Sequence, residues 1–451
     1  MGEIVLLCPE PVRDRVQGIG IRFLEMAQAL RRHGHRVSVW VPNEDIPPEK
    51  AAWMHPVWSS SFRVAVRQCE AVILHGHISE LYFAILEQEG LKDGPPLIVD
   101  LYDPFVIENL QYTPTLGEWV YERDRGVLLR QLQAGDFFLA SSEAQRLFYI
   151  GLLIGTGRLT PRLYHDDPTL RSWIAVVPFG VHPVDPQRLQ DLPGKIKGVL
   201  PGIGPQDVVI FFGGVYEWYD PLLLLEAVEP LIDKGWPLRI LFCRNPNPET
   251  TPQGKLEAVC RWAEAKRWMD RHVFVLPWFS YDERFHFYRD VDIAVSLHRP
   301  SLETELSLRT RLLDYMNAGL PIIATEGGEG SARVLEAGAG LVVPPGDGRR
   351  LQEALETLLV DEDRRRLCGE RGRQWIQKHM TWDRSLRPLV NFCQDPKKRP
   401  SEQSPQNSRD LSPLSRQPQL GFLLREIRHH GLRYGFRGAA RRLWQLWRRG
   451  A

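Results

Sequence analysis

Apolar residues occur along the first half of the chain in short, nearly continuous runs that alternate with stretches of helical periodicity. The runs at 4–8, 36–41, 71–75, 97–101, 136–140 and 174–177 predict six strands. Between the first two runs, Ile21, Leu24, Ala27 and Leu30 follow the spacing of one helix face. Strands without polar alternation are buried on both faces, which is typical of a parallel sheet covered by helices. We therefore predict a doubly wound α/β domain over residues 1–182.

The alternation stops in a segment rich in Pro and Gly, from Pro178 to Pro205, where we place an interdomain linker at 183–205. It then begins again with apolar runs at 208–212, 238–243, 273–276, 291–297, 321–324 and 341–343, and residues 350–393 have a helical pattern broken near Thr381. We predict a second doubly wound domain over 206–393. Two such domains enclose a cleft at the carboxyl ends of their strands, where open α/β sheets bind ligands.

The pattern changes once more after the second domain. Residues 394–419 are rich in Pro, Ser and Gln with almost no apolar side chains, which predicts a disordered linker. Residues 420–451 hold eight Arg and one Glu among Leu, Phe and Trp at roughly helical spacing, which suits an anionic membrane surface. A disordered basic tail and a docking helix for a partner protein are the alternatives. The membrane candidates are Arg441, Arg442, Trp444, Trp447, Arg448 and Arg449.

Composition narrows the class of protein. The 451 residues are 43% hydrophobic and include 14 Trp, which is ample for large cores. Residues 1–393 carry 44 Lys and Arg against 52 Asp and Glu, a net charge of −8, which argues against a nucleic-acid-binding body. The six cysteines are widely spaced, which argues against a zinc site and a disulfide framework and favours the cytosol.

Membrane insertion and export are not expected. No apolar run approaches the length of a membrane-spanning helix, and the first predicted strand leaves no room for a signal peptide. We expect a cytoplasmic protein, with peripheral attachment to the inner face of the plasma membrane if the basic tail binds lipid.

The stretch 300–325 carries the most distinctive chemistry. Its pattern predicts a helix from about Ser307 to Ala318, capped by Ser307 and ended by Gly319. Arg309 would lie in the first turn, where unpaired backbone N–H groups and the helix dipole favour an anion. This geometry suits a diphosphate, while Glu303 and Glu305 precede the helix and could accept sugar hydroxyls. An ordinary amphipathic helix with surface ion pairs explains the same pattern.

Two glycine turns occupy equivalent places in the two domains. Gly18 and Gly20 follow the first strand of the first domain, and Gly213 and Gly214 follow the first strand of the second. Glycines at such turns let a ligand approach the backbone, although the full dinucleotide fingerprint is absent. Each turn alone is explained as well by a tight connection, but the equivalent pair predicts one ligand lying across the cleft.

Polar residues also end strands of the first domain. His77 follows the third predicted strand and Asp103 the fourth, so both lie on the ligand edge, where Asp103 could hydrogen-bond an acceptor hydroxyl. Structural roles for both residues are the alternative. Ser141 and Ser142 lack the motif of a hydrolase nucleophile and are better explained as caps of a helix beginning near Glu143. No cluster has metal-ligand spacing, so we predict no metal site.

Over residues 1–393 the chain resembles the retaining glycosyltransferases of the family-four type, whose two Rossmann-like domains form the GT-B fold. The resemblance rests on the glycine turn at 18–22, on SSEAQRLFYIGLL and VVPFGV, on FFGGVYEWYDP, and on ETELSLRTRLLDYMNAGLPIIAT, which is most similar to enzymes of bacterial cell-surface polysaccharides. In this family two glutamates separated by seven residues frame the nucleotide-sugar site, and a C-terminal helix crosses back onto the first domain, here within 375–392.

The sequence departs from the family pattern at the donor site. Asp314 stands in place of the second glutamate, and Glu305 lies one residue before the position of the first. The Arg and Lys expected after Gly214 are missing from YEWYD, so we expect Arg309, with Arg311 or Arg244, to hold the diphosphate. The catalytic candidates are Asp103, His77 and Glu305; the donor-binding candidates are Gly18, Gly20, Gly213, Gly214, Arg244, Glu303, Ser307, Leu308, Arg309, Arg311 and Asp314.

The resemblance implies a sugar transfer from a nucleoside diphosphate donor to a glycan or lipid-linked acceptor, with retention of configuration and no prosthetic group. Two alternatives share the fold: a nucleotide-sugar 2-epimerase, which needs acid and base carboxylates, and a non-catalytic scaffold, which the missing Arg and Lys would favour.

Overall fold

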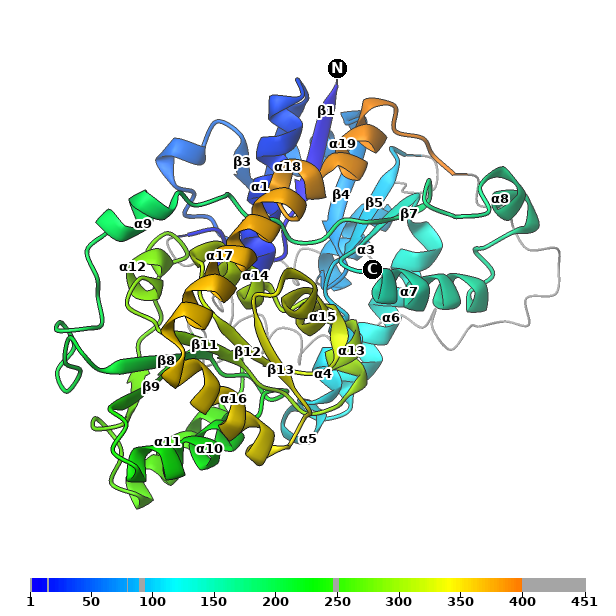
Figure 1. The fold of residues 1–451 in the computed structure, drawn as a ribbon. Coiled ribbons are helices and arrows are strands. Elements are labelled where there is room, and N and C mark those ends of the chain that lie inside the picture. Colours follow the sequence, from blue (N-terminus) through cyan, green and yellow to red (C-terminus); the bar gives the residue numbers. More distant parts are fainter. Residues whose placement is uncertain (1, 14–15, 79, 89–93, 246–250, 400–451) are drawn as a thin grey trace.

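The computed structural model describes residues 2–13, 16–78, 80–88, 94–245 and 251–399, which form two α/β domains (Figure 1). All ladders in both sheets are parallel, as expected for strands that are apolar on both faces. The first sheet has the strand order β3-β2-β1-β4-β5-β6-β7 and the second has the order β10-β9-β8-β11-β12-β13. The doubly wound architecture predicted for both domains is therefore confirmed.

The strands of the first domain are β1 (Glu3–Leu7), β2 (Arg36–Val41), β3 (Met54–Pro56), β4 (Ala71–His75), β5 (Leu97–Leu101), β6 (Phe137–Ala140) and β7 (Ile174–Val176). Those of the second are β8 (Val208–Gly214), β9 (Leu238–Cys243), β10 (Val273–Leu276), β11 (Ile293–Ser296), β12 (Ile322–Thr325) and β13 (Gly340–Val343). The edge strand β3 was not predicted, since three residues ending in proline give too short a pattern.

Alternate residues of the strands face opposite helical layers. Ile4 and Leu6 of β1 pack in one core with Phe23 of α1, whereas Val5 and Leu7 pack in another. The helices of the first domain are α1 (Gly18–Arg32), α2 (Ser61–Gln68), α3 (Glu80–Gln88), α4 (Phe105–Leu110), α5 (Thr113–Leu116), α6 (Trp119–Ala134), α7 (Glu143–Gly155) and α8 (Pro161–Asp166), with a short 3₁₀ turn, η1, at Pro48–Lys50.

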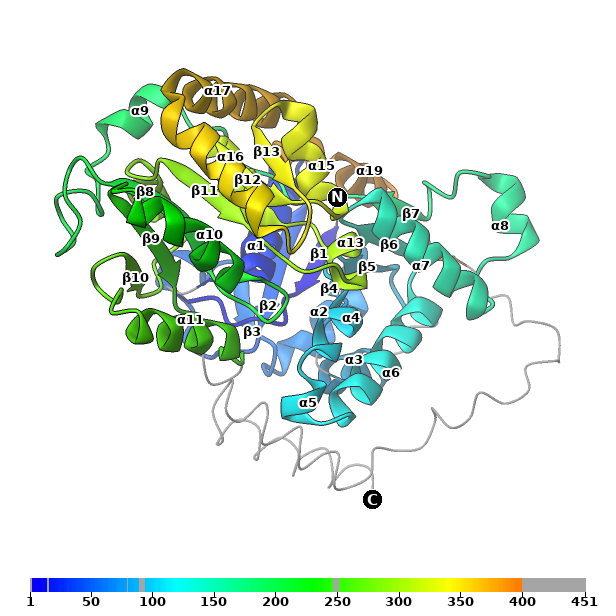
Figure 2. The ribbon, with the colours of Figure 1, turned by 60° about the horizontal axis from the view of Figure 1, so that its bottom comes forward.

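The second domain follows a connection that contains the short helix α9 (Pro186–Asp191), within the segment where we placed the interdomain linker. Figure 2 shows the two domains side by side, with α10, α11 and α16 on the second and α4, α5 and α6 on the first. The remaining helices are α10 (Pro221–Asp233), α11 (Gly254–Ala265), α12 (Arg284–Tyr288), α13 (Leu302–Leu306), α14 (Thr310–Ala318), α15 (Gly328–Ala337), α16 (Gly348–Val360), α17 (Glu362–His379), α18 (Trp382–Ser385) and α19 (Arg387–Gln394).

The helix predicted to begin at Ser307 is two helices in the structure. Ser301 caps α13 by accepting the Thr304 N–H, and Ser307 lies at the C-terminus of that helix with an extended backbone (ψ 135°). The next helix, α14, begins at Thr310 with Arg309 at its N-cap position and no side-chain cap. The predictions that Ser307 caps the helix and that Arg309 lies in its first turn are therefore wrong. Its end at Gly319, in the left-handed conformation, is confirmed.

The C-terminal helices return to the first domain. α18 and α19 contact α1, and the Phe392 ring stacks on Phe137 of β6 with centroids 4.2 Å apart. The helical stretch breaks at Thr381 as predicted, and also at Asp361, which caps α17. Within the described ranges, all six cysteines are free and no helix has the length and apolar character needed to cross a bilayer. Residues 400–451, with most of the predicted linker and the whole basic tail, lie outside the described residues.

Candidate active site

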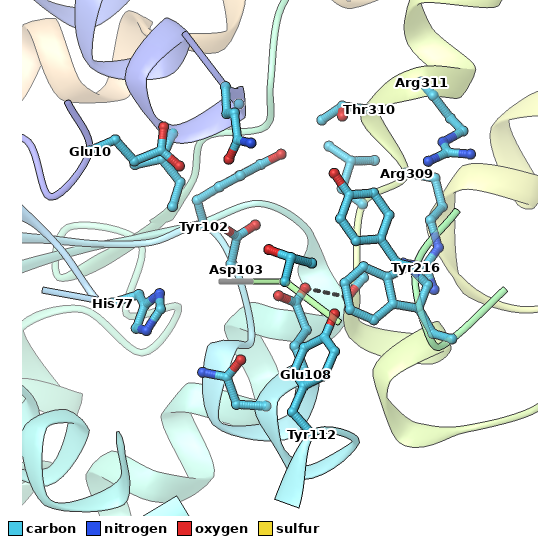
Figure 3. A pocket seen from close by; sticks show the side chains of 18 of the residues that line it. Glu10, His77, Tyr102, Asp103, Glu108, Tyr112, Tyr216, Arg309, Thr310 and Arg311 are labelled. Carbon is cyan, nitrogen blue, oxygen red and sulfur yellow. Dashed lines mark hydrogen bonds between the residues drawn. The ribbon is translucent and has the colours of Figure 1, made fainter. Parts of the chain in front are cut away.

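A cavity of about 390 Å³ lies between the two domains, at the carboxyl ends of their strands. The first domain contributes the segments that follow β1, β4 and β5, together with the start of α1 and parts of α4, α5 and α6. The second domain contributes the segment after β8 and the stretch from Ser307 to Asp314 (Figure 3). Parallel strands direct these connections to one edge, which is why residues distant in sequence meet here.

A second cavity of about 250 Å³ adjoins the first and lies mainly in the second domain. Gly213, Gly214, Arg244 and Tyr315 line it, and Gln17 and Gly18 of the first domain close it. The two cavities share five lining residues, so that they form one continuous space: Gln17, Gly18, Tyr216, Arg311 and Asp314.

Glycines of both predicted turns meet at the smaller cavity. Gly18 is the first residue of α1, and a Cβ atom there would have no neighbour within 4 Å. Gly213 has a φ of 78°, and a Cβ atom there would lie 3.0 Å from the Tyr315 hydroxyl. A side chain is therefore disfavoured at Gly213 both by the backbone conformation and by the close contact.

Gly20 differs from the other predicted glycines. Its backbone N–H donates to the Glu10 carboxylate at 2.9 Å, so a side chain of the protein occupies this amide at the start of α1. Glu10 itself lines the larger cavity. The sequence did not single out Glu10, although its position just after β1 is the signal that could have found it.

The stretch from Ser307 to Asp314 faces the larger cavity, as the sequence led us to expect for a ligand-binding segment. The Arg309 guanidinium, however, makes a bidentate ion pair with Glu303, with both N–O distances 2.6 Å and exposed fractions of 7% and 1%. The pairing suggested for a surface helix is thus present but buried. The pair uses two of the five N–H groups of the guanidinium and compensates its charge, and Arg309 Nε is buried without a hydrogen-bond partner among the described residues.

The other two arginines are placed differently. The Arg311 guanidinium donates to the Phe212 carbonyl oxygen at 3.0 Å and lies 4.2 Å over the Tyr219 ring. Arg244 is exposed beside the smaller cavity, and its side chain makes no ion pair with the described residues. Arg244 is therefore the arginine whose charge is most available to a ligand there.

The three carboxylates predicted at the donor site lie in three different environments. Asp314 lines both cavities and accepts from Arg284 Nε at 3.1 Å, and burial raises its pKa. Glu303 is held by Arg309. Glu305 is exposed, accepts the Gly328 N–H at 3.4 Å, and is not among the residues lining either cavity. Of the three, Asp314 is the carboxylate that the structure brings to the ligand space.

The first domain brings both predicted residues, His77 and Asp103, to the larger cavity (Figure 3). The His77 ring stacks on Phe105, with centroids 5.4 Å apart. Asp103 lies 3.8 Å from His75 Nε2, and burial lowers the His75 pKa to about 4, so this imidazole is neutral at pH 7. Burial and the nearby Glu108 raise the pKa of Asp103 well above its usual value.

Glu108 of α4 is a site residue that the sequence did not reveal. Its carboxylate accepts from the Ser307 hydroxyl at 3.2 Å, which joins the two domains across the cavity. Burial, and then the charge of Glu303, raise the Glu108 pKa to about 7. Glu108 lies within a short helix that carries no recognisable motif. Its contact with the second domain appears only in the folded structure, so the sequence alone did not single it out.

An aromatic cluster forms part of the second-domain wall, where the family pattern led us to look for Arg and Lys. Tyr216, Trp218 and Tyr219 line the larger cavity with Tyr112 of the first domain. The Tyr216 and Trp218 rings are stacked, with centroids 5.0 Å apart and an interplanar angle of 4°. Trp218 Nε1 is buried and has no hydrogen-bond partner in the described part of the chain.

Two expectations from outside the cleft can also be compared with the structure. The Ser142 hydroxyl accepts the Gln145 N–H at 3.1 Å at the start of α7, which confirms its predicted capping role. Among the described residues, no group of three His, Cys, Asp or Glu side chains is arranged to hold a metal ion. The predicted tail residues Arg441, Arg442, Trp444, Trp447, Arg448 and Arg449 lie outside the described residues.

Sequence comparison finds that residues 206–361 match the family model described as glycosyl transferases group 1. D-inositol 3-phosphate glycosyltransferase of Corynebacterium urealyticum is 27% identical over 208 residues, which are 45% of this chain and 47% of that protein. A GDP-mannose-dependent alpha-(1-6)-phosphatidylinositol monomannoside mannosyltransferase of Mycobacterium tuberculosis is 36% identical over 83 residues, 18% of this chain and 21% of that protein. The chain thus spans less than half of either curated relative.

Comparison of folds extends over most of the chain. Sucrose-phosphate synthase from Thermosynechococcus elongatus has a TM-score of 0.61 at 14% identity and covers 87% of this chain and 99% of its own. Anabaena HepE in complex with UDP and glucose has a TM-score of 0.60 at 12% identity, with 88% and 100% covered. These similarities establish that the two domains have the GT-B arrangement.

Proposed function

We propose that this chain transfers a sugar from a nucleoside diphosphate donor to a hydroxyl acceptor with retention of configuration, because residues 206–361 match the model of the glycosyl transferases group 1 and the two domains have the GT-B fold. The observation that carries the proposal is the continuous space between the domains. It is bordered by Gly18, by Gly213 and Gly214, and by the uncapped start of α14.

The diphosphate of the donor would lie against the Gly213–Gly214 turn and the N-terminus of α14. Neither glycine has a side chain to keep the phosphate from the backbone, and the first amides of α14 have no side-chain cap. Arg244 supplies the available positive charge, with Arg311 behind it. Asp314 would accept the ribose hydroxyl protons. HepE, solved with UDP and glucose, supports a nucleoside diphosphate sugar as the class of donor.

Arg309 has a supporting place in this proposal. Its guanidinium is paired with Glu303 and lies within 5.4 Å of the Tyr219 ring centroid, so it fixes the loop that precedes α14 rather than clamping phosphate. The start of α14 then presents its amides in one orientation. Preorganised donors of this kind stabilise the charge that develops on a leaving diphosphate, and the loss of one typically costs about 10²-fold in rate.

The acceptor would enter from the first domain. Its hydroxyl would approach the donor carbon between Asp103 and the start of α14, with His77 on the same wall. In the retaining mechanism that we propose, an oxygen of the leaving diphosphate takes the acceptor proton as the new glycosidic bond forms. The residues of the first domain then orient the hydroxyl and limit the access of water.

Cell-surface glycan synthesis is part of the proposal. The phosphatidylinositol mannoside mannosyltransferase among the relatives supports a lipid-linked or glycan acceptor. The basic, Trp-containing segment 420–451 would hold the enzyme at an anionic membrane surface, an inference from its sequence alone. Sedimentation with anionic liposomes tests this: pelleting of the full chain but not of residues 1–419 is expected, and equal pelleting of both forms would contradict it.

The main experiment is a thermal-shift screen of UDP, GDP, ADP and dTDP and of their sugars, followed by transfer assays with the best donor. We expect one nucleotide family to raise the Tm, and NMR of the product to show the anomeric configuration of the donor retained. No stabilisation by any of these compounds would overturn the proposal, and an inverted product would overturn the retaining mechanism.

A nucleotide-sugar 2-epimerase is the second candidate. The observation in its favour is the pair of carboxyl groups with raised pKa values, Asp103 and Glu108, on the same cavity wall, since epimerisation needs acid and base groups near neutral pH. Product analysis without any acceptor separates the two: conversion of the donor into another nucleotide-sugar indicates an epimerase, and its absence favours the transferase.

A further inference from the structure

The wall that the first domain presents to the larger cavity is acidic. Glu10, Asp103 and Glu108 all line it, from three different segments of the domain (Figure 3). Arg123 is the arginine on this wall, and its Nε atom donates to the Asp124 carboxylate at 2.7 Å, so its charge is already compensated. An acceptor that reaches this wall therefore meets carboxyl oxygens rather than a cationic pocket.

The arginines on the opposite wall do not change this. The Arg309 guanidinium is neutralised by its bidentate pair with Glu303. Arg311 is shared with the smaller cavity, where the donor diphosphate is proposed to bind, and it already donates to the Phe212 carbonyl. Arg244, the arginine that is exposed and makes no ion pair with the described residues, thus lies on the donor side, whereas the acceptor side presents carboxyl groups.

Aromatic rings face the same space from the second domain. The parallel stack of Tyr216 on Trp218 extends the aromatic area along the cavity, and Tyr112 meets Trp218 edge-on at 6.3 Å. Aromatic surface with a few directed polar groups is the usual composition of a site for a small, partly apolar ligand.

A sugar ring has the groups needed to contact both the aromatic wall and the acidic wall. Its C–H face can pack on an aromatic ring, and its hydroxyls can donate to carboxylate oxygens or accept from protonated carboxyl groups. A phosphorylated or carboxylated ring would instead place its anionic oxygens against Asp103 and Glu108. Burial raises the pKa of both carboxyl groups, and an anion bound there would have no cation among the described residues to compensate it. Leaving a charge buried and uncompensated costs several kcal/mol in binding, which corresponds to about 10²-fold or more.

From this arrangement we infer that the acceptor unit bound in the larger cavity is an uncharged sugar ring, packed on Trp218 with its hydroxyls toward Asp103 and Glu108, and that rings carrying a phosphate or carboxylate are excluded. The inference rests on the proposed glycosyl transfer and adds its acceptor class. It also distinguishes this chain from an enzyme that glycosylates an inositol phosphate, the acceptor in the name of one curated relative.

The test compares matched acceptors at saturating donor: methyl glycosides of common hexoses and the same glycosides bearing a 6-phosphate. For the neutral member of the preferred pair we expect a kcat/KM about 10²-fold higher or more. At pH 8, above the Glu108 pKa of about 7, Asp103→Asn combined with Glu108→Gln should reduce that ratio at least tenfold, because the variant wall keeps hydrogen-bonding groups but no carboxyl group. Glu122→Gln, which alters an exposed carboxylate of α6 outside the cavity, should leave the ratio unchanged.

A second variant tests the aromatic wall. Trp218→Leu should raise the KM for the neutral acceptor about tenfold or more while the Kd for the donor nucleotide stays within about twofold, with folding checked by Tm. Equal or better transfer to the phosphorylated glycoside would overturn the inference. Donor binding and slow donor hydrolysis are measured without acceptor; their absence would instead overturn the proposed function, and this inference with it.

Discussion

The buried Arg309–Glu303 pair provides the sharpest test of how the site is built. Arg309→Ala would leave the Glu303 carboxylate, which is 1% exposed, without its guanidinium partner. Breaking a buried pair in this way costs about 3–5 kcal/mol, a large fraction of the roughly 5–15 kcal/mol that holds a domain folded. We expect urea unfolding to show this loss as a lower midpoint for the second domain.

The double variant Arg309→Met with Glu303→Leu separates the pair from the charge it leaves behind. Replacing both partners of a buried pair by apolar side chains of similar volume is often close to neutral. We therefore expect the double variant to recover most of the lost free energy of unfolding, so that it lies within about 1–2 kcal/mol of the wild type.

Arg244→Ala is the matched control for ligand binding. Because this side chain is exposed and unpaired with the described residues, its loss should change the free energy of unfolding by about 0.5 kcal/mol or less. Loss of a charged hydrogen bond to the diphosphate should still weaken nucleotide binding about tenfold or more in calorimetry. If Arg309→Ala unfolds like the wild type but abolishes nucleotide binding, the reasoning is refuted and Arg309 is a ligand residue.

Three further outcomes are expected. Since burial and Glu303 raise the Glu108 pKa from 4.5 to about 7, the free energy of unfolding should fall as the pH rises through that interval, and Glu108→Gln should flatten this slope in pH-dependent urea titrations. Gly151→Ala, in open space within α7, should stabilise by about 0.5–1 kcal/mol, whereas Gly369→Ala in α17 would overlap a backbone carbonyl and should lower the Tm. Phe392→Ala, which removes a half-buried ring stacked on Phe137 of β6, should lower the free energy of unfolding by about 1–2 kcal/mol in chemical denaturation.

The strands could be predicted because their signal is local. Runs such as 97–101 and 238–243 are apolar on both faces, and the structure has strands with the same bounds. β3 escaped prediction because its three residues pair only at the sheet edge with β2. A buried strand can thus be predicted from its own residues. A short strand at the edge of a sheet depends on pairing with a neighbour that is distant in sequence.

The division between α13 and α14 shows the limit of periodicity. Leu308 and Leu312 keep the helical spacing across the break. The apolar pattern therefore continues through a segment in which the backbone is not helical. Ser307 turns the chain to an extended conformation, and this brings Arg309 back onto Glu303, six residues earlier. Such a pair depends on the path of the loop, which spacing along one helix does not reveal.

Sequence features marked cavity-lining residues in both domains: Gly18, His77 and Asp103 in the first, and Gly213, Gly214 and Asp314 in the second. A glycine turn after a strand and a polar residue at the end of a strand are local features, which a single sequence shows. Glu10 and Glu108 carry no motif and matter only because the two domains face each other. Residues whose contacts cross the domain interface cannot be recognised from a single sequence.

We propose that a nucleoside diphosphate binds between the Gly213–Gly214 turn and the start of α14. Hydrogen–deuterium exchange, with and without the nucleotide that most raises the Tm, tests it directly at these backbone amides. Slower exchange is expected in peptides covering 211–216 and 307–314, and unchanged exchange in a peptide covering α7. Unchanged exchange in both cleft peptides, or protection confined to other segments, would contradict it.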